Sequence, residues 1–340
     1  SAARKVRAGD AESSINSAVD ALVSLAKALG DRLRADILRV LHQDSYAVGE
    51  LCEVFEVPQP ALSHHLKILL TAGLVARRRE GNSLFYRRAT PSPAASAFFA
   101  ELDQEPVAGT VSDRVARIHA ERNERSARFF EQNGEQIRTH QAEICEPETY
   151  QDAVLELIDQ AIAEGLNARQ ALEVGPGANT LLGSLANRFN KAIGVDNSRS
   201  MLAAAEAALP AGSSAELRHQ DFMALPQRRR YDALVAAMVI HHQASPAAFF
   251  KQAAAVLKAG GCIVVAELCP HDQEWAQSAC GDQWLGFEPD QLTGWAERAG
   301  LQPADAQYLA QKNGFRVQVH RFAQARCCLL YTSPSPRDRS

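Results

Sequence analysis

The sequence predicts two domains of different fold class, a mostly α-helical domain followed by an α/β domain. The chain has 340 residues, of which 46% are hydrophobic, and this is enough to form two cores. Helical repeats of apolar residues fill most of the first hundred residues and lead into a β-hairpin pattern. From residue 170 onward strand and helix patterns alternate, which predicts a parallel, doubly wound sheet that closes with an antiparallel hairpin.

Four helical segments and a hairpin make up the first part of the chain. In the first segment Val19, Leu22 and Val23 recur at helical spacing, which predicts a buried face. The predicted order is helices over 15–30, 32–43 and 47–55, a fourth from 57 that Gly73 ends, then two strands within 74–88 around a Gly-Asn turn. Such an order predicts a winged helix-turn-helix, in which the fourth helix enters the major groove of DNA.

Polar and basic residues lie where this fold would meet operator double-stranded DNA. Residues 1–100 carry a net charge of +3, whereas the rest of the chain carries −7. The candidate DNA contacts are Gln59, Ser63, His64 and Lys67 on the fourth helix, opposite its leucines, and Arg77, Arg78, Arg79 and Arg87 on the wing. Helix side chains can reach base edges, and wing arginines can neutralise phosphates. A solvated charged face with surface histidines remains the alternative.

Acidic residues follow three successive strands of the predicted sheet. The stretch "EVGPGANT" supplies Glu173, Gly175 and Gly177 after the first strand, and Asn179 stands where a third glycine is expected. Asp196 ends the second strand, and Asp221 and Phe222 follow the third. S-adenosyl-L-methionine carries an ammonium and a sulfonium but no phosphate, so carboxylates at strand ends suit it better than a dinucleotide. Each acid could instead cap a helix.

His241 and His242 follow the fourth strand, where one of them could take a proton from a methyl acceptor. Alternatively, they shape the cofactor site or face solvent. Cys262, Cys269 and Cys280 allow a comparison with arsenite-binding sites, but cysteine on an apolar strand is usually a core residue.

Residues 18–90, which include "VGELCEVFEVPQPALSHHLKILLTAGLV" and "RREGNSLFYR", resemble the ArsR/SmtB family of bacterial repressors. This resemblance implies operator binding by a homodimer. Many members of that family release DNA on binding a metal. Here Ala47 and Gly49 stand where the arsenite sensors have cysteines, Cys52 is alone, and the helix after the wing has no histidine, so we predict no metal site.

Residues 150–323 resemble the class I S-adenosyl-L-methionine-dependent methyltransferases, which have a Rossmann-like sheet. "ALEVGPGANTLLG", "AIGVDNSRSMLAAA" and "HQDFMALP" carry this likeness. The resemblance implies that Glu173, Gly175 and Gly177 surround the methionine part of the cofactor, Asp196 the ribose, and Asp221 and Phe222 the adenine. The whole chain is similar to bacterial ArsR-type regulators fused to methyltransferases, which implies a small-molecule methyl acceptor.

The predicted organisation is a DNA-binding and dimerisation domain over 15–103, a helical linker over 104–149 and a methyltransferase domain over 150–325. The tail 328–340 resembles translated sequencing adaptor. Seven scattered cysteines and no apolar run of bilayer length predict a cytoplasmic protein that meets no membrane. Three functions stay open: a regulator with a working methyltransferase, a regulator whose second domain only senses S-adenosyl-L-methionine or S-adenosylhomocysteine, and an enzyme whose first domain only dimerises it.

Overall fold

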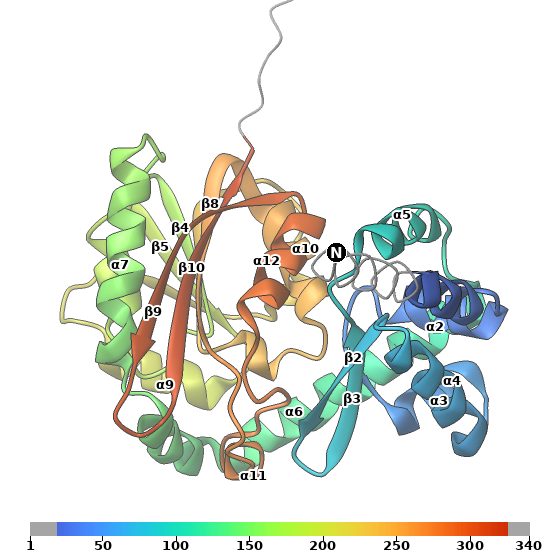
Figure 1. Cartoon of the computed structure of the whole chain (residues 1–340). Coiled ribbons are helices and arrows are strands. Elements are labelled where there is room, and N and C mark those ends of the chain that lie inside the picture. The colour runs from blue at the N-terminus through green and yellow to red at the C-terminus, as the bar shows by residue number, and fades with distance from the viewer. Residues whose placement is uncertain (1–18, 326–340) are drawn as a thin grey trace, which may run out of the picture. The chain divides into compact units, whose positions relative to one another are not determined.

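The computed structural model describes residues 19–325, with the backbone alone at 134–136 and 138. The predicted adaptor tail and the first residues of the predicted first domain lie outside this range. The chain forms two compact units, Ser1–Arg125 and Ser126–Ser340, coloured along the chain in Figure 1. The division falls within helix α6 (Gly109–Ile144), so this helix contributes residues to both units and forms most of the segment predicted as a linker.

The N-terminal unit is a helical domain with a small antiparallel sheet. Residues 19–29 are helical. The elements that follow are α2 (Arg32–Val40), β1 (Tyr46–Ala47), α3 (Val48–Phe55), α4 (Gln59–Thr71), β2 (Val75–Glu80), β3 (Ser83–Arg88) and α5 (Pro93–Leu102). The sheet has the order β1-β3-β2, and the β2–β3 hairpin turns at Gly81 and Asn82 as predicted. The predicted winged helix-turn-helix fold is therefore confirmed.

Apolar residues at helical spacing build the core of this unit. Leu62, Leu66 and Leu69 line the inner face of α4 and are fully buried together with Ile37 and Leu38 of α2. The first helix differs from the prediction, because Val19, Leu22 and Val23 are 52, 55 and 45% exposed. Their repeat marks one helix face, and nothing within residues 19–325 of this chain buries these three side chains.

The C-terminal unit is a seven-stranded sheet with helices on both faces. Its strands are β4 (Gln170–Val174), β5 (Lys191–Asp196), β6 (Glu216–His219), β7 (Tyr231–Ala237), β8 (Leu257–Leu268), β9 (Leu301–Ala310) and β10 (Arg316–Gln324). The helices are α7 (Pro147–Ala163), α8 (Leu181–Ala186), α9 (Arg199–Ala208), α10 (Pro246–Val256), α11 (Trp275–Cys280) and α12 (Pro289–Arg298). Short 3-10 turns span Phe222–Ala224 and Ile240–His242.

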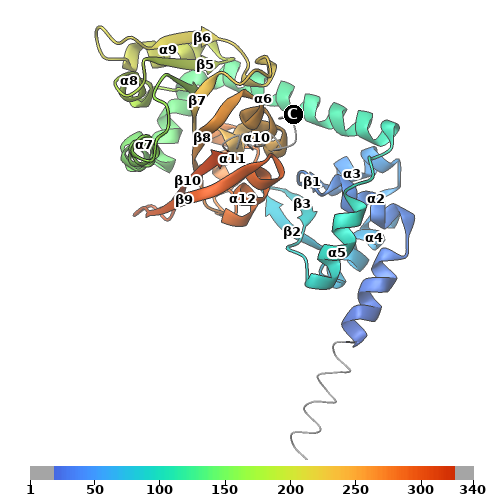
Figure 2. The same ribbon diagram turned by 90° about the horizontal axis from the view of Figure 1, so that it is seen from above.

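The strand order β6-β5-β4-β7-β8-β10-β9 confirms the predicted doubly wound sheet and its terminal hairpin. Strands β4 to β8 run parallel, whereas β10 is antiparallel to both of its neighbours. Figure 2 shows the sheet from above, with β6, β5, β7, β8, β10 and β9 labelled in this sequence across it. The carboxyl ends of the five parallel strands consequently lie on one edge, which is where ligands bind in sheets of this class.

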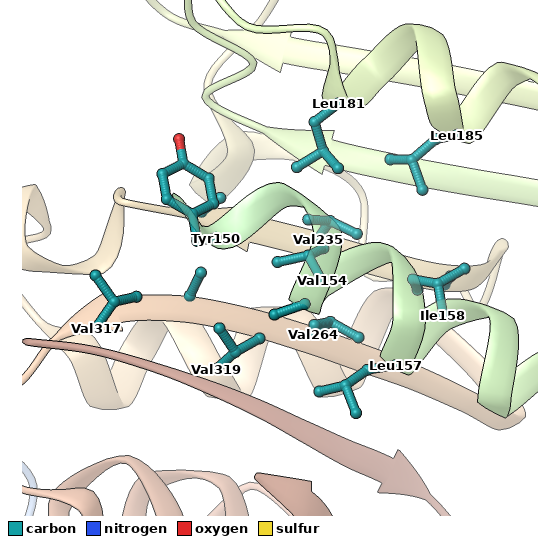
Figure 3. Close-up of a cluster of buried hydrophobic side chains, with 14 of the residues drawn as sticks. Tyr150, Val154, Leu157, Ile158, Leu181, Leu185, Val235, Val264, Val317 and Val319 are labelled. Carbon is teal, nitrogen blue, oxygen red and sulfur yellow. The ribbon is translucent and has the colours of Figure 1, made fainter. Parts of the chain in front are cut away.

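Two apolar layers hold the sheet in place. On one face α7 packs against α8 and the alternate residues of β7, β8 and β10, and Figure 3 shows Val154, Leu157 and Ile158 in this layer. On the other face Phe250 of α10 contacts Trp295 of α12 and Phe322 of β10. Because both faces are covered, every residue of β7 is buried.

Two strand limits differ from the strand patterns of the sequence. The run "YDALVAAMVI" predicts a fourth strand that reaches Ile240, but β7 ends at Ala237, and the next residue, Met238, takes a left-handed conformation (φ 58°). The run "CIVVAEL" predicts a fifth strand from Cys262, but β8 begins at Leu257 and accommodates the extra residues through a register shift against β7. Within residues 19–325, no helix is both long and apolar enough to cross a bilayer.

Candidate functional site

The loop after β4 places a buried carboxylate at the ligand-binding edge of the sheet. Glu173 is 1% exposed, and neither of its oxygens accepts a hydrogen bond from the described residues. Burial raises its pKa well above the usual value, and the nearby Asn179 offsets only part of this shift. A buried carboxyl group without a hydrogen-bond donor is costly, and a cationic group beside Glu173 could offset this cost.

The two glycines of this loop adopt conformations that other residues rarely take. Gly175 has φ +64° and Gly177 has φ +51°. A Cβ atom on Gly175 would lie 2.7 Å from Cγ2 of Val239, so this loop packs directly against the turn that follows β7. The loop and the turn that carries the two histidines are therefore neighbours.

Asn179 has a structural role that a third glycine would lack. Its Nδ2 donates to the carbonyl of Pro176 at 2.7 Å, and its Oδ1 accepts from the backbone N–H of Leu181 at 2.8 Å. The side chain thus ties the loop together and satisfies an amide at the start of α8. The sequence departs from the glycine pattern without leaving the loop unsupported.

The other acids predicted at the cofactor site lie at the same edge. Asp196 ends β5 beside the loop, accepts from the backbone N–H of Ser198 at 2.7 Å, and has its pKa raised to about 6 by burial. Asp221 is exposed after β6, and its Oδ1 accepts from the backbone N–H of Met223 at 2.9 Å. Phe222 is 5% exposed, and its ring packs against Phe249.

A single buried carboxylate organises the turn after β7. Glu267 of β8 is fully buried, and its Oε1 accepts from the backbone N–H groups of Val239 and Ile240 at 3.0 and 2.5 Å. Its Oε2 contacts Nδ1 of His241 at 2.7 Å. The left-handed Met238 begins this turn, and such a strained residue is typical of functional loops.

His241 and His242 form a buried cluster with Asp282. The shortest separations are 3.7 Å between Nε2 of His241 and Oδ1 of Asp282, and 3.8 Å between Nδ1 of His242 and the same oxygen. Burial works against the charged form of His241, but Glu267 and Asp282 raise its pKa to about 9. Burial also raises the pKa of Asp282 to about 7, and burial and the neighbouring His241 lower the pKa of His242.

Backbone contacts fix the loop of Asp282 against the histidines. The backbone N–H groups of Gln283 and Trp284 donate to the carbonyl of His241 at 3.0 and 3.2 Å. The side chain of Gln283 donates to the carbonyl of His242 at 2.6 Å. The ring of Phe130, from α6, meets His242 edge-on at 4.8 Å. Neither histidine faces solvent, which removes one of the alternatives left open by the sequence.

Three residues of this region were missed from the sequence. Glu267 lies within an apolar strand, and Asp282 lies in a loop without a pattern. Tyr150 of α7 is 4% exposed, and its hydroxyl lies in the electrostatic field of Glu173 and Glu267. In Figure 3 the oxygen of Tyr150 points away from the valine layer. Glu267 in the apolar run "VVAEL" was the one signal in the sequence, because burying a carboxylate on an apolar strand is costly unless it has a partner.

The three cysteines that invited comparison with arsenite sites are buried. Cys262 and Cys280 belong to the main core, and Cys269 is 7% exposed. Burial raises the pKa of all three thiols, so the thiolate form that would bind arsenic is disfavoured.

The outer face of α4 carries the polar residues predicted to reach DNA. Gln59, Ser63, His64 and Lys67 are all exposed, whereas the leucines between them are buried. His65 lies on another side of the helix, and its Nδ1 is 3.7 Å from Oδ1 of Asp31.

The hairpin distributes its arginines over two faces. Cross-strand pairing sets Arg77 opposite Tyr86 and Arg79 opposite Leu84, while Arg78 lies opposite Phe85. Because side chains alternate along a strand, Arg77 and Arg79 share one face, and Arg78 shares the other with Arg87, which pairs with Ala76. Arg77 and Arg79 are exposed, whereas Arg78 is half-buried with its Nε 3.4 Å from Glu80.

Comparisons with known proteins match the two units separately. Residues 31–77 match the family model described as bacterial regulatory protein, arsR family. Residues 172–265 match the model described as methyltransferase domain. The second match covers Glu173, Asp196, Asp221 and the histidine turn.

Sequence relatives agree with this division. The arsenical resistance operon repressor of Bacillus subtilis is 34% identical over 99 residues, which are 29% of this chain and 81% of that protein. The HTH-type transcriptional repressor SmtB of Mycobacterium tuberculosis is 41% identical over 71 residues, 21% of this chain, and the match spans only 53% of that repressor.

A relative of the second unit is the ubiquinone biosynthesis O-methyltransferase of Bradyrhizobium, which is 31% identical over 121 residues. This match covers 35% of the chain and 48% of that enzyme. With a winged helix-turn-helix in the first unit and a doubly wound sheet in the second, the chain belongs to the ArsR family of bacterial regulatory proteins and carries a methyltransferase domain.

Proposed function

We propose that the protein is a transcriptional regulator that binds operator DNA as a homodimer and transfers a methyl group from S-adenosyl-L-methionine to a small molecule. The family membership supports the first activity and the methyltransferase domain the second. The observation that carries the cofactor assignment is the buried Glu173, whose oxygens accept no hydrogen bond from the described residues. An ammonium group would supply the missing donor.

The cofactor would lie along the carboxyl edge of β4, β5 and β6. In this proposal Glu173 faces the ammonium, and Gly175 and Gly177 allow the backbone to approach the methionine part. Asp196 has a second oxygen besides the one bonded to Ser198, and it would accept from the ribose hydroxyls. Asp221 would bind the adenine amino group, with Phe222 beside it. Asn179 would act indirectly, by bracing the loop.

When bound, the cofactor supplies an activated methyl group and its leaving group. The chain's own contribution is alignment of the acceptor and removal of its proton. His241 and His242 stand beside the Gly175 loop, because Val239 contacts that loop. The contact between Nδ1 of His241 and Glu267 fixes the orientation of its ring. His242, whose pKa is lowered, would be the neutral base.

The DNA-binding surface would combine the outer face of α4 with the wing. Gln59, Ser63, His64 and Lys67 would reach base edges, since all four are exposed on one helix face. Arg77 and Arg79 are the better placed of the four wing arginines to neutralise phosphates, because Arg78 and Arg87 share the other face of the hairpin and are half-buried.

A sensor of S-adenosyl-L-methionine or S-adenosylhomocysteine is the second candidate function. The exposed fraction of His241 is only 3%, so the proposed base is covered in this conformation. Such a domain would bind the cofactor and change DNA affinity by linkage without transferring the methyl group.

One experiment separates these functions. The full chain is incubated with S-adenosyl-L-methionine carrying a labelled methyl group and with deproteinised bacterial extract. DNA from the region upstream of the gene is titrated in parallel by fluorescence anisotropy. Labelled small molecules and an equal amount of S-adenosylhomocysteine are expected. A cofactor-dependent change in DNA affinity without methyl transfer would support the sensor, and the absence of cofactor binding would refute both functions.

A further inference from the structure

Two histidines after β7 and one aspartate after α11 form a cluster. The proposed methyl transfer needs only one of these residues, as a base. One ligand-capable atom from each of His241, His242 and Asp282 lies within 4.8 Å of the others, and all three residues are buried. Within residues 19–325, this is the one group of His, Cys, Asp or Glu residues with such spacing.

Asp282 gives an independent reason to expect a ligand. Its side chain is 1% exposed, and neither oxygen accepts a hydrogen bond from the described residues. A buried carboxylate in this state has lost its hydration, and the ring of His241 compensates for this only from 3.7 Å, so a bound cation would stabilise it further. The imidazole nitrogens 3.7 and 3.8 Å away are too far for hydrogen bonds.

In each histidine, one ring nitrogen lies near an oxygen that can accept a hydrogen bond. Nδ1 of His241 contacts Glu267 at 2.7 Å, and Nδ1 of His242 lies 3.4 Å from the carbonyl of Gly281. Nε2 of His242 is buried and has no hydrogen-bond partner among the described residues. Histidines that bind metals almost always donate their other N–H to a carboxylate or carbonyl in this way.

From this geometry we propose that His241, His242 and Asp282 bind a divalent first-row transition metal ion. Two imidazoles and one carboxylate are ligands that suit zinc, iron, cobalt or nickel better than magnesium or calcium. Ligand atoms about 2.0 Å from a tetrahedral ion are about 3.3 Å apart. The observed 3.7 Å between Nε2 of His241 and Oδ1 of Asp282 would therefore need to contract by a few tenths of an ångström, and the ligand atom of His242 lies within 4.8 Å of both.

The surroundings also favour a cation. Glu267 and Asp282 bring two carboxylates to the cluster, and with neutral imidazoles a divalent ion would balance their charge. Three protein ligands leave at least one coordination position open, as in sites where metals bind a reactant rather than only stabilise a fold. The proposal concerns the C-terminal unit, and with the ion bound His242 is a ligand and does not act as the base of the proposed methyl transfer. It departs from the sequence-based prediction of no metal site, which was based on Cys52 and the other sensor positions of the N-terminal unit.

The test uses the full chain, treated with a chelator and then equilibrated with Zn²⁺ or Co²⁺. One ion per chain is expected by elemental analysis, and the Co²⁺ form should show visible absorption typical of nitrogen and oxygen ligands in a low coordination number. Asp282→Asn should weaken binding at least about 100-fold, and Glu267→Gln about 10- to 100-fold, since it only orients His241. His140→Gln, a half-buried histidine on α6 outside the cluster, should bind as the unchanged protein does.

Folding is checked in the same samples. Asp282→Asn removes a buried charge and should melt no lower than the metal-free protein. Zn²⁺ should raise the melting temperature of the unchanged chain and of His140→Gln, but not that of Asp282→Asn. Absence of stoichiometric binding in the unchanged protein would overturn the proposal and leave a plain histidine–carboxylate network. Binding that survives in Asp282→Asn would overturn it too, because the ion would then lie elsewhere.

Discussion

The carboxylate of Glu267 contacts Nδ1 of His241 at 2.7 Å, and its other oxygen accepts from the two backbone amides that precede this histidine. The side chain of Glu267 on β8 therefore holds the turn after β7, which begins at the left-handed residue Met238. The arrangement makes Glu267 a positioning residue, and its loss should affect stability as well as the site.

Replacing Glu267 by alanine should lower the free energy of unfolding by about 3–5 kcal/mol, because His241 and two amides would be buried without their partner. Urea denaturation followed by circular dichroism measures the change. Glu206→Ala, which removes an exposed carboxylate on α9, should stay within about 0.5 kcal/mol of the unchanged protein. A loss below about 1 kcal/mol in Glu267→Ala would contradict this role.

The pKa of Glu173 predicts a pH dependence of cofactor binding. Burial raises this pKa well above 4.5, so the free protein keeps the proton to higher pH than an exposed carboxyl group would, and a bound ammonium would lower the pKa again. Affinity should therefore rise with pH through the window above 4.5 and level off beyond the raised pKa. Calorimetry over a series of pH values above 4.5, in two buffers of different ionisation enthalpy, measures the released proton, and Glu173→Gln should release none.

The raised pKa of Glu173 also predicts how the stability of the cofactor-free protein depends on pH. Because the folded-state pKa of Glu173 exceeds the unfolded value, its contribution to stability is present at low pH and is lost as pH rises through the folded-state pKa. Glu173→Gln should remove this loss, so the variant should be more stable than the unchanged chain at pH 8. Equal melting temperatures at that pH would argue against a buried, strained carboxyl group.

Asn179 should matter more for stability than a loop residue usually does. Asn179→Ala removes the donor to Pro176 and the acceptor for Leu181, and should cost about 1–2 kcal/mol. Asn179→Asp keeps the acceptor for Leu181 and loses only the donor to Pro176, so it should cost less than Asn179→Ala. Chemical denaturation measures both changes, and an unchanged unfolding free energy in both variants would contradict this role.

The wing arginines should differ from one another in DNA affinity. Changing Arg77 and Arg79 together to alanine should reduce the slope of log K against log salt by about 2, since each phosphate contact contributes about 0.9. Arg78→Ala should have a smaller effect, because this side chain is half-buried beside Glu80. Arg188→Ala, on the C-terminal unit, is the charge-matched control. Equal salt slopes for all variants would exclude the wing from the interface.

The sequence was sufficient for the order of the elements and for the edge of the sheet that carries the site. Helical repeats located the leucines of α4, and alternating strand and helix patterns located Glu173, Asp196 and Asp221 at strand ends. Side chains alternate along a strand, so the sequence also implies that Arg77 and Arg78 point to opposite sides of the hairpin.

The remaining features depend on contacts between residues far apart in the chain. Glu267 and Asp282 meet His241 across 26 and 41 positions, and no local pattern marks such a pair. The end of β7 depends on the left-handed Met238, which propensity does not predict. The first helix shows the opposite case. The repeat at Val19, Leu22 and Val23 is clear in the sequence, but it does not indicate which surface packs against this exposed face.

Binding of S-adenosyl-L-methionine to the full chain, measured by isothermal titration calorimetry, tests the central claim most directly. One molecule per chain should bind, and Glu173→Gln should weaken the affinity about 10- to 100-fold, as expected for the loss of one charge-assisted pair. Glu216→Gln, which alters a carboxylate at the opposite end of the parallel strands, should leave the affinity unchanged. Failure of the unchanged chain to bind, or equal affinities for the two variants, would contradict the assignment of Glu173 to the cofactor.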